Sequence, residues 1–453
     1  MSDGIESFGY KQELKRSLSL SDLLVYGLVF IVPIAPVAVF GIVFNASHGM
    51  VPLVYAIGLV AMVFTALSYM AMSKAIPVAG SVYAYAAHAL GPTAGFFAGW
   101  AILLDYLLLP TLSYVACAIA IHSALPPVPP WICVVALLAL ATAINYFGIE
   151  TTARANVVLL VFQLIALALF AVLAVWALAH GTGGAHLSLL PLFDPAHVSF
   201  GLLFGALSLA VLSFLGFDAI STLSEESRGG AKAIARATMA SLCISAVLFV
   251  AQTWLASLFV LGRTGFAPGD ATNAAFYDIA AMIGGYWLKF LLAVPVVAVS
   301  GVAGALTAQA ATARLLFSMA RDGKLPRFLA VVEPKRAVPA NAIFAVAVVT
   351  LVLGIFLVDK LELLTSMVSF GALVGFLLLH VSVMVWFLRH QGSRDWLRHL
   401  VLPLIGLGVI ATVLVNAERN AKIAGVLWMI GGLVLFLVLR RLGRSTVLPV
   451  DSV

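Results

Sequence analysis

Charged side chains are scarce in this sequence of 453 residues. Asp, Glu, Lys and Arg together make up 10% of it, whereas hydrophobic residues make up 63%. A soluble domain carries about 25% charged residues. The composition therefore excludes a soluble globular protein and indicates a chain whose surface lies mostly in a lipid bilayer.

Cysteine is rarer still, and the histidines do not form a site in its place. Cys117, Cys133 and Cys243 all lie in apolar runs, so they form neither a disulfide framework nor the spacing of a metal site. The nine histidines show no clustered pattern of nucleophile and base or of metal ligands. We therefore predict no metal, no cofactor and no enzymatic activity.

Polar stretches long enough for a soluble domain are also missing. Apolar runs dominate instead, and about 20 apolar residues suffice to span a bilayer as a helix. The predicted fold class is an all-α polytopic membrane protein with twelve transmembrane helices. The first run follows a polar head without a convincing cleavage site, so we interpret it as a retained helix and not as a signal peptide. The predicted spans are 19–45, 51–73, 92–121, 130–148, 154–179, 198–226, 236–261, 285–319, 339–358, 362–388, 399–417 and 422–440.

Lysine and arginine are distributed unevenly between the two sides of these spans. Five of the 25 fall on one side, which leaves 20 on the other. Loops rich in Lys and Arg stay in the cytoplasm, so we predict that both termini are cytoplasmic. The net charge of +6 then reflects topology and a weak attraction to anionic lipid, and it gives no support to nucleic-acid binding. The five residues on the poorer side are Arg263, Lys289, Lys360, Arg419 and Lys422.

Two of the predicted spans contain an interruption. Span 1 holds Pro33-Ile34-Ala35-Pro36, and span 6 holds Gly216 two residues before Asp218. Proline removes a backbone donor, and glycine lowers the cost of leaving helical geometry. Freed backbone groups are tolerated at membrane depth only where they face protein or a wet cavity. The pair of breaks predicts a polar pocket near the midplane, although a simple proline kink would explain span 1 alone.

The two broken spans also run in opposite directions across the membrane, and each leads a set of five. This arrangement is typical of secondary transporters built from a 5+5 inverted repeat. The halves show no residue-level identity. The repeat is therefore predicted from hydropathy, breaks and topology.

Acidic residues at membrane depth mark the predicted pocket. Asp105 lies in span 3 and Asp218 in span 6, and no Lys or Arg lies near the middle of any predicted span. Each such acid costs about 2.5–3.5 kcal/mol on insertion scales, so it needs a partner or a function. Uncompensated acids facing a cavity favour a cationic substrate or protons. Tyr106 could add a cation–π face or a hydroxyl contact, and a structural hydrogen bond is the alternative for Asp105.

Further residues complete the predicted site. The aromatic rings near the breaks are candidate walls or gates, with lipid contact or core packing as their alternative. Glu225 and Glu226 lie near the cytoplasmic end of span 6 and are candidates for gating or coupling. Ion pairs with the nearby Arg228, Lys232 and Arg236 are the simpler interpretation of these glutamates. Together with Asp105, Tyr106 and Asp218, the candidate substrate-binding residues are Phe30, Pro33, Ile34, Ala35, Phe214, Gly216 and Phe217.

Several stretches carry a resemblance to a known family. Residues 216–226 are similar to the sixth helix of amino acid–polyamine–organocation transporters, and residues 313–326 with Pro339 resemble a cytoplasmic run of the same transporters. Within that superfamily, residues 103–107 and 370–374 are similar to those of bacterial putrescine importers. The resemblance implies a LeuT-like fold, location in the bacterial inner membrane, usually proton-coupled uptake, and contact between Tyr106 and the substrate.

The resemblance also suggests how the chain is organised. Residues 1–18 would be a cytoplasmic tail, 19–388 a transport core of helices 1–10, 389–440 helices 11 and 12, and 441–453 a second cytoplasmic tail. The sequence departs from the superfamily's amino-acid transporters in span 1. Those carry a Gly-small-Gly turn whose N–H groups hold the substrate carboxylate, whereas this chain has two prolines there and loses two donors.

The expected function is import of a small cationic amine, a diamine such as putrescine, by alternating access with proton coupling. An amino-acid permease or exchanger of the same superfamily is the alternative. A transporter-derived sensor or a channel is the least favoured alternative, because the sequence shows no signalling domain and no filter-like repeat. The exact substrate, the coupling ion and the oligomeric state are left open by the sequence.

Overall fold

The computed structural model describes residues 13–124, 127–147, 149–357, 361–417 and 419–441. Within these ranges the chain is helical and has only isolated bridges in place of strands. The α-helices are α1 (Leu20–Ile31), α2 (Pro36–Ser47), α3 (Val51–Ala75), α4 (Val82–Leu90), α5 (Pro92–Ala124), α6 (Pro130–Phe147), α7 (Ile149–Ala179), α8 (Phe200–Ala210), α9 (Gly230–Ser257), α10 (Asp270–Asn273), α11 (Ala275–Gly284), α12 (Tyr286–Ala298), α13 (Ala305–Arg321), α14 (Ala340–Phe356), α15 (Leu361–Met384), α16 (Leu402–Asn416) and α17 (Arg419–Arg441).

Short 3₁₀ and π segments connect or extend several of these helices. Two of them, η3 and η4, belong to the sixth predicted span, and η6 joins α12 to α13. The 3₁₀ segments are η2 (Thr182–Gly184), η3 (Val211–Phe214), η4 (Phe217–Glu226), η5 (Leu258–Val260) and η7 (Arg327–Ala330), and the π segments are η6 (Val299–Gly304), η8 (Val385–His390) and η9 (Leu397–Val401).

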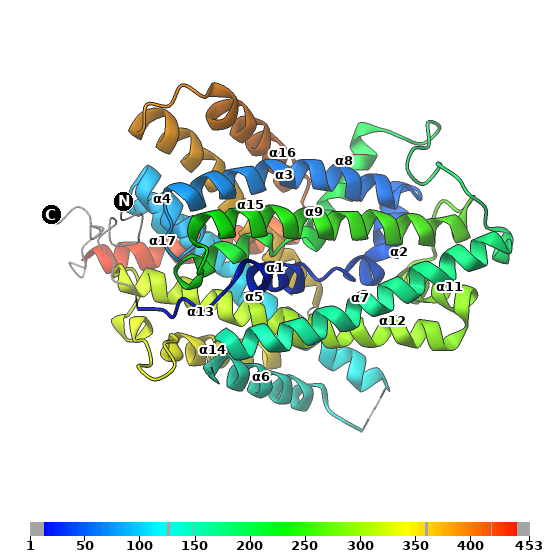
Figure 1. The fold of residues 1–453 in the computed structure, drawn as a ribbon, viewed down its shortest axis with the longest axis horizontal. Helices are drawn as coiled ribbons and strands as arrows, with labels where there is room; N and C mark the ends of the chain where they lie inside the picture. The colour runs from blue at the N-terminus through cyan, green and yellow to red at the C-terminus, as the bar shows by residue number, and fades with distance from the viewer. Residues whose placement is uncertain (1–12, 125–126, 148, 358–360, 418, 442–453) are drawn as a thin grey trace.

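The long helices lie side by side in one elongated bundle (Figure 1). Eight of those described are long and apolar enough to cross a membrane, and two bent pairs raise the number to ten. The other two predicted spans, 285–319 and 339–358, are also helical and coincide with α12–η6–α13 and α14. The all-α membrane fold is confirmed, whereas the number twelve and the inverted repeat stay predictions.

The break in span 1 falls where the prolines predict it. Helix α1 ends at Ile31, and Val32 adopts a left-handed conformation with φ 58° and ψ 83°. This conformation is rare for a β-branched residue. Pro36 then occupies the first turn of α2, where its missing N–H costs nothing. The two halves meet at an angle of 50°.

The break in span 6 is longer than a single turn. Helix α8 tightens into η3, the chain extends at Leu215, and Gly216 takes a φ of 115°. The chain continues as η4, a 3₁₀ helix of 10 residues. Three hydroxyls stabilise η4 because each donates to the carbonyl three residues earlier, at 2.6 Å in every case: those of Ser221, Thr222 and Ser224.

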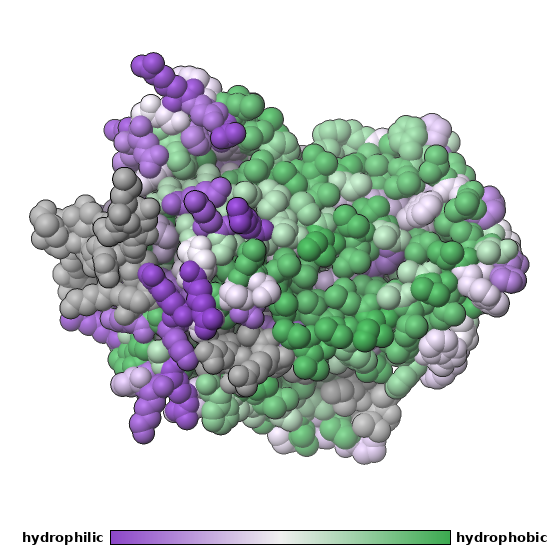
Figure 2. Space-filling view, in the orientation of Figure 1, coloured by the Kyte–Doolittle hydropathy of each residue, from purple (hydrophilic) through white to green (hydrophobic). Residues whose placement is uncertain are grey.

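Polarity is divided along the bundle. Hydrophobic side chains cover its middle, and hydrophilic ones gather toward the end at which α3, α13 and α17 finish (Figure 2). We call this the basic end, because the last turns of these helices carry Lys74, Arg321 and Arg441. Exposed apolar side chains on the long helices, such as Val158 and Phe290, are what a lipid-facing surface requires.

Candidate functional site

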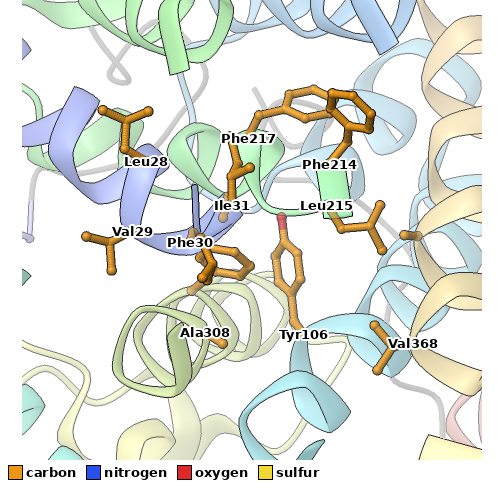
Figure 3. Close-up of a cluster of buried hydrophobic side chains, with 14 of the residues drawn as sticks. Leu28, Val29, Phe30, Ile31, Tyr106, Phe214, Leu215, Phe217, Ala308 and Val368 are labelled. Atoms are coloured by element: carbon orange, nitrogen blue, oxygen red, sulfur yellow. The ribbon is translucent and has the colours of Figure 1, made fainter. Parts of the chain in front are cut away.

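The two breaks touch each other inside the bundle. A Cβ atom added at Gly216 would collide with the ring and backbone of Phe30. One turn before Phe30, a Cβ at Gly27 would collide with Ile220 and Ser241. Glycine is therefore required at 216 for two reasons, its positive φ and the lack of space. Figure 3 shows Phe30 and Ile31 beside Phe217 and Leu215.

Asp218 lies at this contact and is fully buried. One of its carboxylate oxygens accepts from the Gly216 N–H at 3.2 Å, and the other accepts from the Tyr106 hydroxyl at 2.5 Å. The Thr312 hydroxyl in turn donates to the Tyr106 carbonyl at 2.5 Å. Helices α5 and α13 are thereby joined to the break of span 6.

Asp105 precedes Tyr106 near the middle of α5 and is also buried. It packs against α15, where a Cβ at Gly371 would lie 2.8 Å from the Asp105 nitrogen. Within the described ranges, its Oδ1 has no hydrogen-bond partner, and neither Asp105 nor Asp218 forms an ion pair with Lys or Arg. Asp105 is linked to Asp218 through its neighbour Tyr106, whose hydroxyl donates to the Asp218 carboxylate. A buried pair of acids without a cation favours binding a cation or a proton.

The aromatic candidates separate into two groups. The Phe30 ring faces Tyr106 at a centroid distance of 6.2 Å, so it forms a wall of the acidic site (Figure 3). Phe217 packs on the other side of the break, with its centroid 5.9 Å from that of Phe376. Phe214 belongs to a different cluster, because its ring packs on Phe249 of α9 at 5.2 Å.

Two glutamines satisfy the broken backbone of span 1. The Gln252 amide donates to the Pro33 carbonyl at 2.8 Å, and the Ile34 N–H donates to Gln163 Oε1 at 3.4 Å. The Ala35 N–H donates to the Val32 carbonyl at 2.8 Å. Sequence reasoning did not select Gln163 and Gln252, although a buried amide within an apolar span is itself a signal. The N–H groups at this break are thus occupied.

The two glutamates after the break are gating candidates with unexpected partners. Glu226 pairs with Arg314 through Nε and through Nη2, which lies 3.1 Å from Oε2. Glu225 pairs with Arg321 at 2.8 Å and accepts from the Ala79 N–H at 3.0 Å.

The prediction that these glutamates pair with the cations that follow them in sequence was wrong. The reason is geometric, because η4 packs against α13 and turns both carboxylates toward it. The cations expected in their place were Arg228, Lys232 and Arg236.

Main-chain bonds close the same region. The N–H groups of Ser17 and Leu18 both donate to the Glu226 carbonyl at 3.1 Å, and the Arg228 N–H donates to the Leu18 carbonyl at 2.8 Å. The chain entering α1 is thereby tied to the end of η4. Side chains and backbone together cover the acidic site from the basic end.

A second cover lies at the opposite end. Helices α10 and α11 pack on α2 so closely that a Cβ at Gly41 would collide with the Thr272 carbonyl. Asn45 fixes this contact, because its amide donates to the Thr272 hydroxyl at 3.2 Å and its oxygen accepts from the Phe266 N–H at 2.6 Å. Reaching the acidic site therefore requires one of the two covers to move.

Comparisons with known proteins agree with this architecture. The model of the amino acid permease family matches residues 21–440. The low-affinity putrescine importer of Escherichia coli K12 is 32% identical over 460 residues, which cover 100% of both chains. The branched-chain amino acid permease of Bacillus subtilis is 25% identical over 97% of this chain and 96% of that one. The methylthioribose transporter of the same organism is 26% identical over 95% of each. The chain is therefore a multi-pass membrane protein and a transporter rather than an enzyme. It belongs to the amino acid permease family of the amino acid–polyamine–organocation superfamily.

Proposed function

We propose that this transporter imports a small cationic amine, namely a diamine such as putrescine. The observation that carries the proposal is the pair Asp105 and Asp218, both buried, connected through Tyr106 and without a described cationic partner. Each carboxylate would take one ammonium end of the substrate. An ammonium at about 4 Å from a carboxylate gains ~4 kcal/mol at an effective dielectric of 20, before desolvation is subtracted.

The walls of the site suit the hydrocarbon part of such a substrate. Phe30 and Tyr106 lie on one side of the pair, with ring centroids 6.2 Å apart. Aromatic faces attract ammonium groups and cover methylene groups at the same time. Phe217 would close the other side of the break, whereas Phe214 would act through packing.

The state of the span 1 break argues against an α-amino acid. A carboxylate there would need free N–H donors. Pro33 has none, and those of Ile34 and Ala35 already donate to Gln163 and to the Val32 carbonyl. The identity to a putrescine importer supports the same conclusion.

Transport would proceed by alternating movement of the two covers. The glutamate–arginine pairs and the tail before α1 would open on the cytoplasmic side, and α10–α11 with α2 on the outer side. We place the protein in the bacterial inner membrane with both termini in the cytoplasm, because 20 of the 25 Lys and Arg residues then lie inside. Protons are proposed to couple to uptake, since buried acids can take them when the amine is absent.

Labelled putrescine uptake into proteoliposomes tests this proposal. We expect saturable uptake that unlabelled cadaverine reduces and unlabelled leucine does not. An inward proton gradient should raise the initial rate at constant membrane potential. Failure of any diamine to compete would contradict the substrate class.

An amino-acid permease is the second candidate, and one observation favours it. Branched-chain amino acid permeases of two organisms align with most of this chain at 25% and 26% identity. The competition assay separates the candidates, because inhibition by leucine but not by cadaverine would support the permease.

A further inference from the structure

A cavity at the basic end lies outside the transport site. It has a volume of about 790 Å³ and is formed by the end of α3 and the beginning of α9. These two helices pack along one another in the bundle (Figure 1). Its lining residues include three cations and no acid: Lys74, Lys232 and Arg236.

None of these three cations has an ion-pair partner in the part of the chain that the structure describes. The acids of span 6 that lie nearest in sequence to Lys232 and Arg236 are Glu225 and Glu226. Both form ion pairs with arginines of α13 instead. Three positive charges therefore line one cavity without internal compensation. Such a cavity attracts an anion, and the phosphate group is the commonest anion at a membrane surface.

The helices around the cavity show which source of phosphate fits. On α9, Arg236 is followed along the same face by Cys243 and Val247, and Val247 is 63% exposed. On α3, Lys74 is preceded along one face by Val60, which is 60% exposed. Both helices thus carry a cation at the basic end and an apolar exposed stripe leading away from it.

The length of the stripe matches one leaflet of a bilayer. The 11 positions from Arg236 to Val247 correspond to about 16 Å of helix at ~1.5 Å per residue. Half of a hydrocarbon core of roughly 30 Å has about the same thickness. A phosphate in the cavity would place acyl chains along this stripe, which a soluble phosphate would leave unused.

We propose that this cavity binds the headgroup of an anionic phospholipid of the inner leaflet. Lys74, Lys232 and Arg236 contact its phosphate, and the exposed faces of α3 and α9 contact its acyl chains. The neighbouring crevice on the other side of Lys74 is excluded, because its Arg398 already pairs with Asp395 at 3.5 Å. The placement in the inner leaflet uses the proposed orientation, but binding itself does not depend on amine transport.

Native mass spectrometry of the purified full chain tests this inference. The protein is incubated with phosphatidylglycerol and phosphatidylcholine that carry identical acyl chains, and the retained lipid is measured. The groove variant combines Lys74→Gln, Lys232→Gln and Arg236→Gln. A control variant removes three exposed cations at the same end but outside the cavity: Arg327→Gln, Lys335→Gln and Arg394→Gln.

We expect the unmodified protein and the control variant to prefer phosphatidylglycerol. In the groove variant the preference for phosphatidylglycerol should fall by about a hundredfold. Each cation near a membrane surface contributes about fivefold, and the variant removes three of them. All three residues are exposed, so gel filtration should show an intact protein.

Three results would overturn the inference. The first is an equal loss in both variants, which would indicate diffuse surface charge. The second is an unchanged preference in the groove variant. The third is displacement of the lipid by millimolar inorganic phosphate, which would indicate a site for a soluble anion.

Discussion

Replacing Glu226 with glutamine should open the basic end of the bundle. Glu226 and Arg314 are 2% and 5% exposed, and they share two contacts. The substitution removes the negative charge that faces the buried guanidinium, which keeps its bond to the Ala310 carbonyl at 2.8 Å and gains only a neutral acceptor at position 226. Removing one partner of a buried ion pair costs about 3–5 kcal/mol. The closed state should therefore lose roughly 10²–10⁴-fold in population relative to an open one.

Cysteine labelling measures this shift. Ser224 is buried two residues before Glu226, so a Ser224→Cys reporter in a background without native cysteines reacts slowly with a maleimide while the end is closed. Adding Glu226→Gln should accelerate labelling about a hundredfold, within the range given by the loss of the pair. The matched control is Asp395→Asn, which removes an exposed pair with Arg398.

The control should change labelling little, because exposed ion pairs contribute about 0–1 kcal/mol. An unchanged rate with Glu226→Gln would refute the gating role of the pair. Equal acceleration by both substitutions would refute it as well, since it would reflect a general loosening.

Other substitutions test the architecture of the site. Tyr106→Phe should destabilise the protein by about 1.5–3 kcal/mol, because its hydroxyl donates to a carboxylate. Tyr114→Phe on the same helix should not, because its hydroxyl has no described partner; equal melting temperatures of the two variants would contradict the bond. Gly216→Ala should lower the melting temperature, and adding Phe30→Ala should recover part of the loss, because a Cβ at 216 meets that ring; no recovery would mean that the positive φ dominates. Gln252→Leu should lower the melting temperature through a loss of about 1–3 kcal/mol, because it leaves a buried carbonyl of the break unsatisfied; an unchanged value would show that the carbonyl finds another donor.

The course of the helices was predictable from the sequence. The predicted spans 51–73 and 130–148 correspond to Val51–Ala75 and Pro130–Phe147. Apolar length and hydropathy are properties of single segments, so they can be detected without knowing the packing. The positions of the breaks followed from the chemistry of proline and glycine at Pro36 and Gly216.

The contacts between distant segments were not predictable in this way. Arg314 is 88 positions from Glu226, and their pairing arises only when η4 packs on α13. Sequence proximity instead favoured Arg228, Lys232 and Arg236, and the last two of these line the cavity between α3 and α9. Helices α4 and α11 were also missed, because each has at most 10 residues and gives no membrane-spanning signal.

The amides at the break of span 1 illustrate the same limit. Gln163 and Gln252 were visible as polar residues inside apolar spans, but their partners are backbone groups of span 1. Only the packing of α7 and α9 on α1 shows that they replace the missing helical bonds. A rule that examines every buried amide within a predicted span would have found them.

Uptake of labelled putrescine by the Asp105→Asn variant tests the central claim most directly. The substitution keeps the shape of the side chain and removes one of the two buried charges. The account predicts a KM raised by about 10–100-fold, because an interaction with a charged group contributes about 1.5–3 kcal/mol. Asp278→Asn, at an exposed acid that pairs with Lys289, should leave KM unchanged. Saturable uptake with the same KM in Asp105→Asn as in the unmodified protein would contradict the role of the acidic pair.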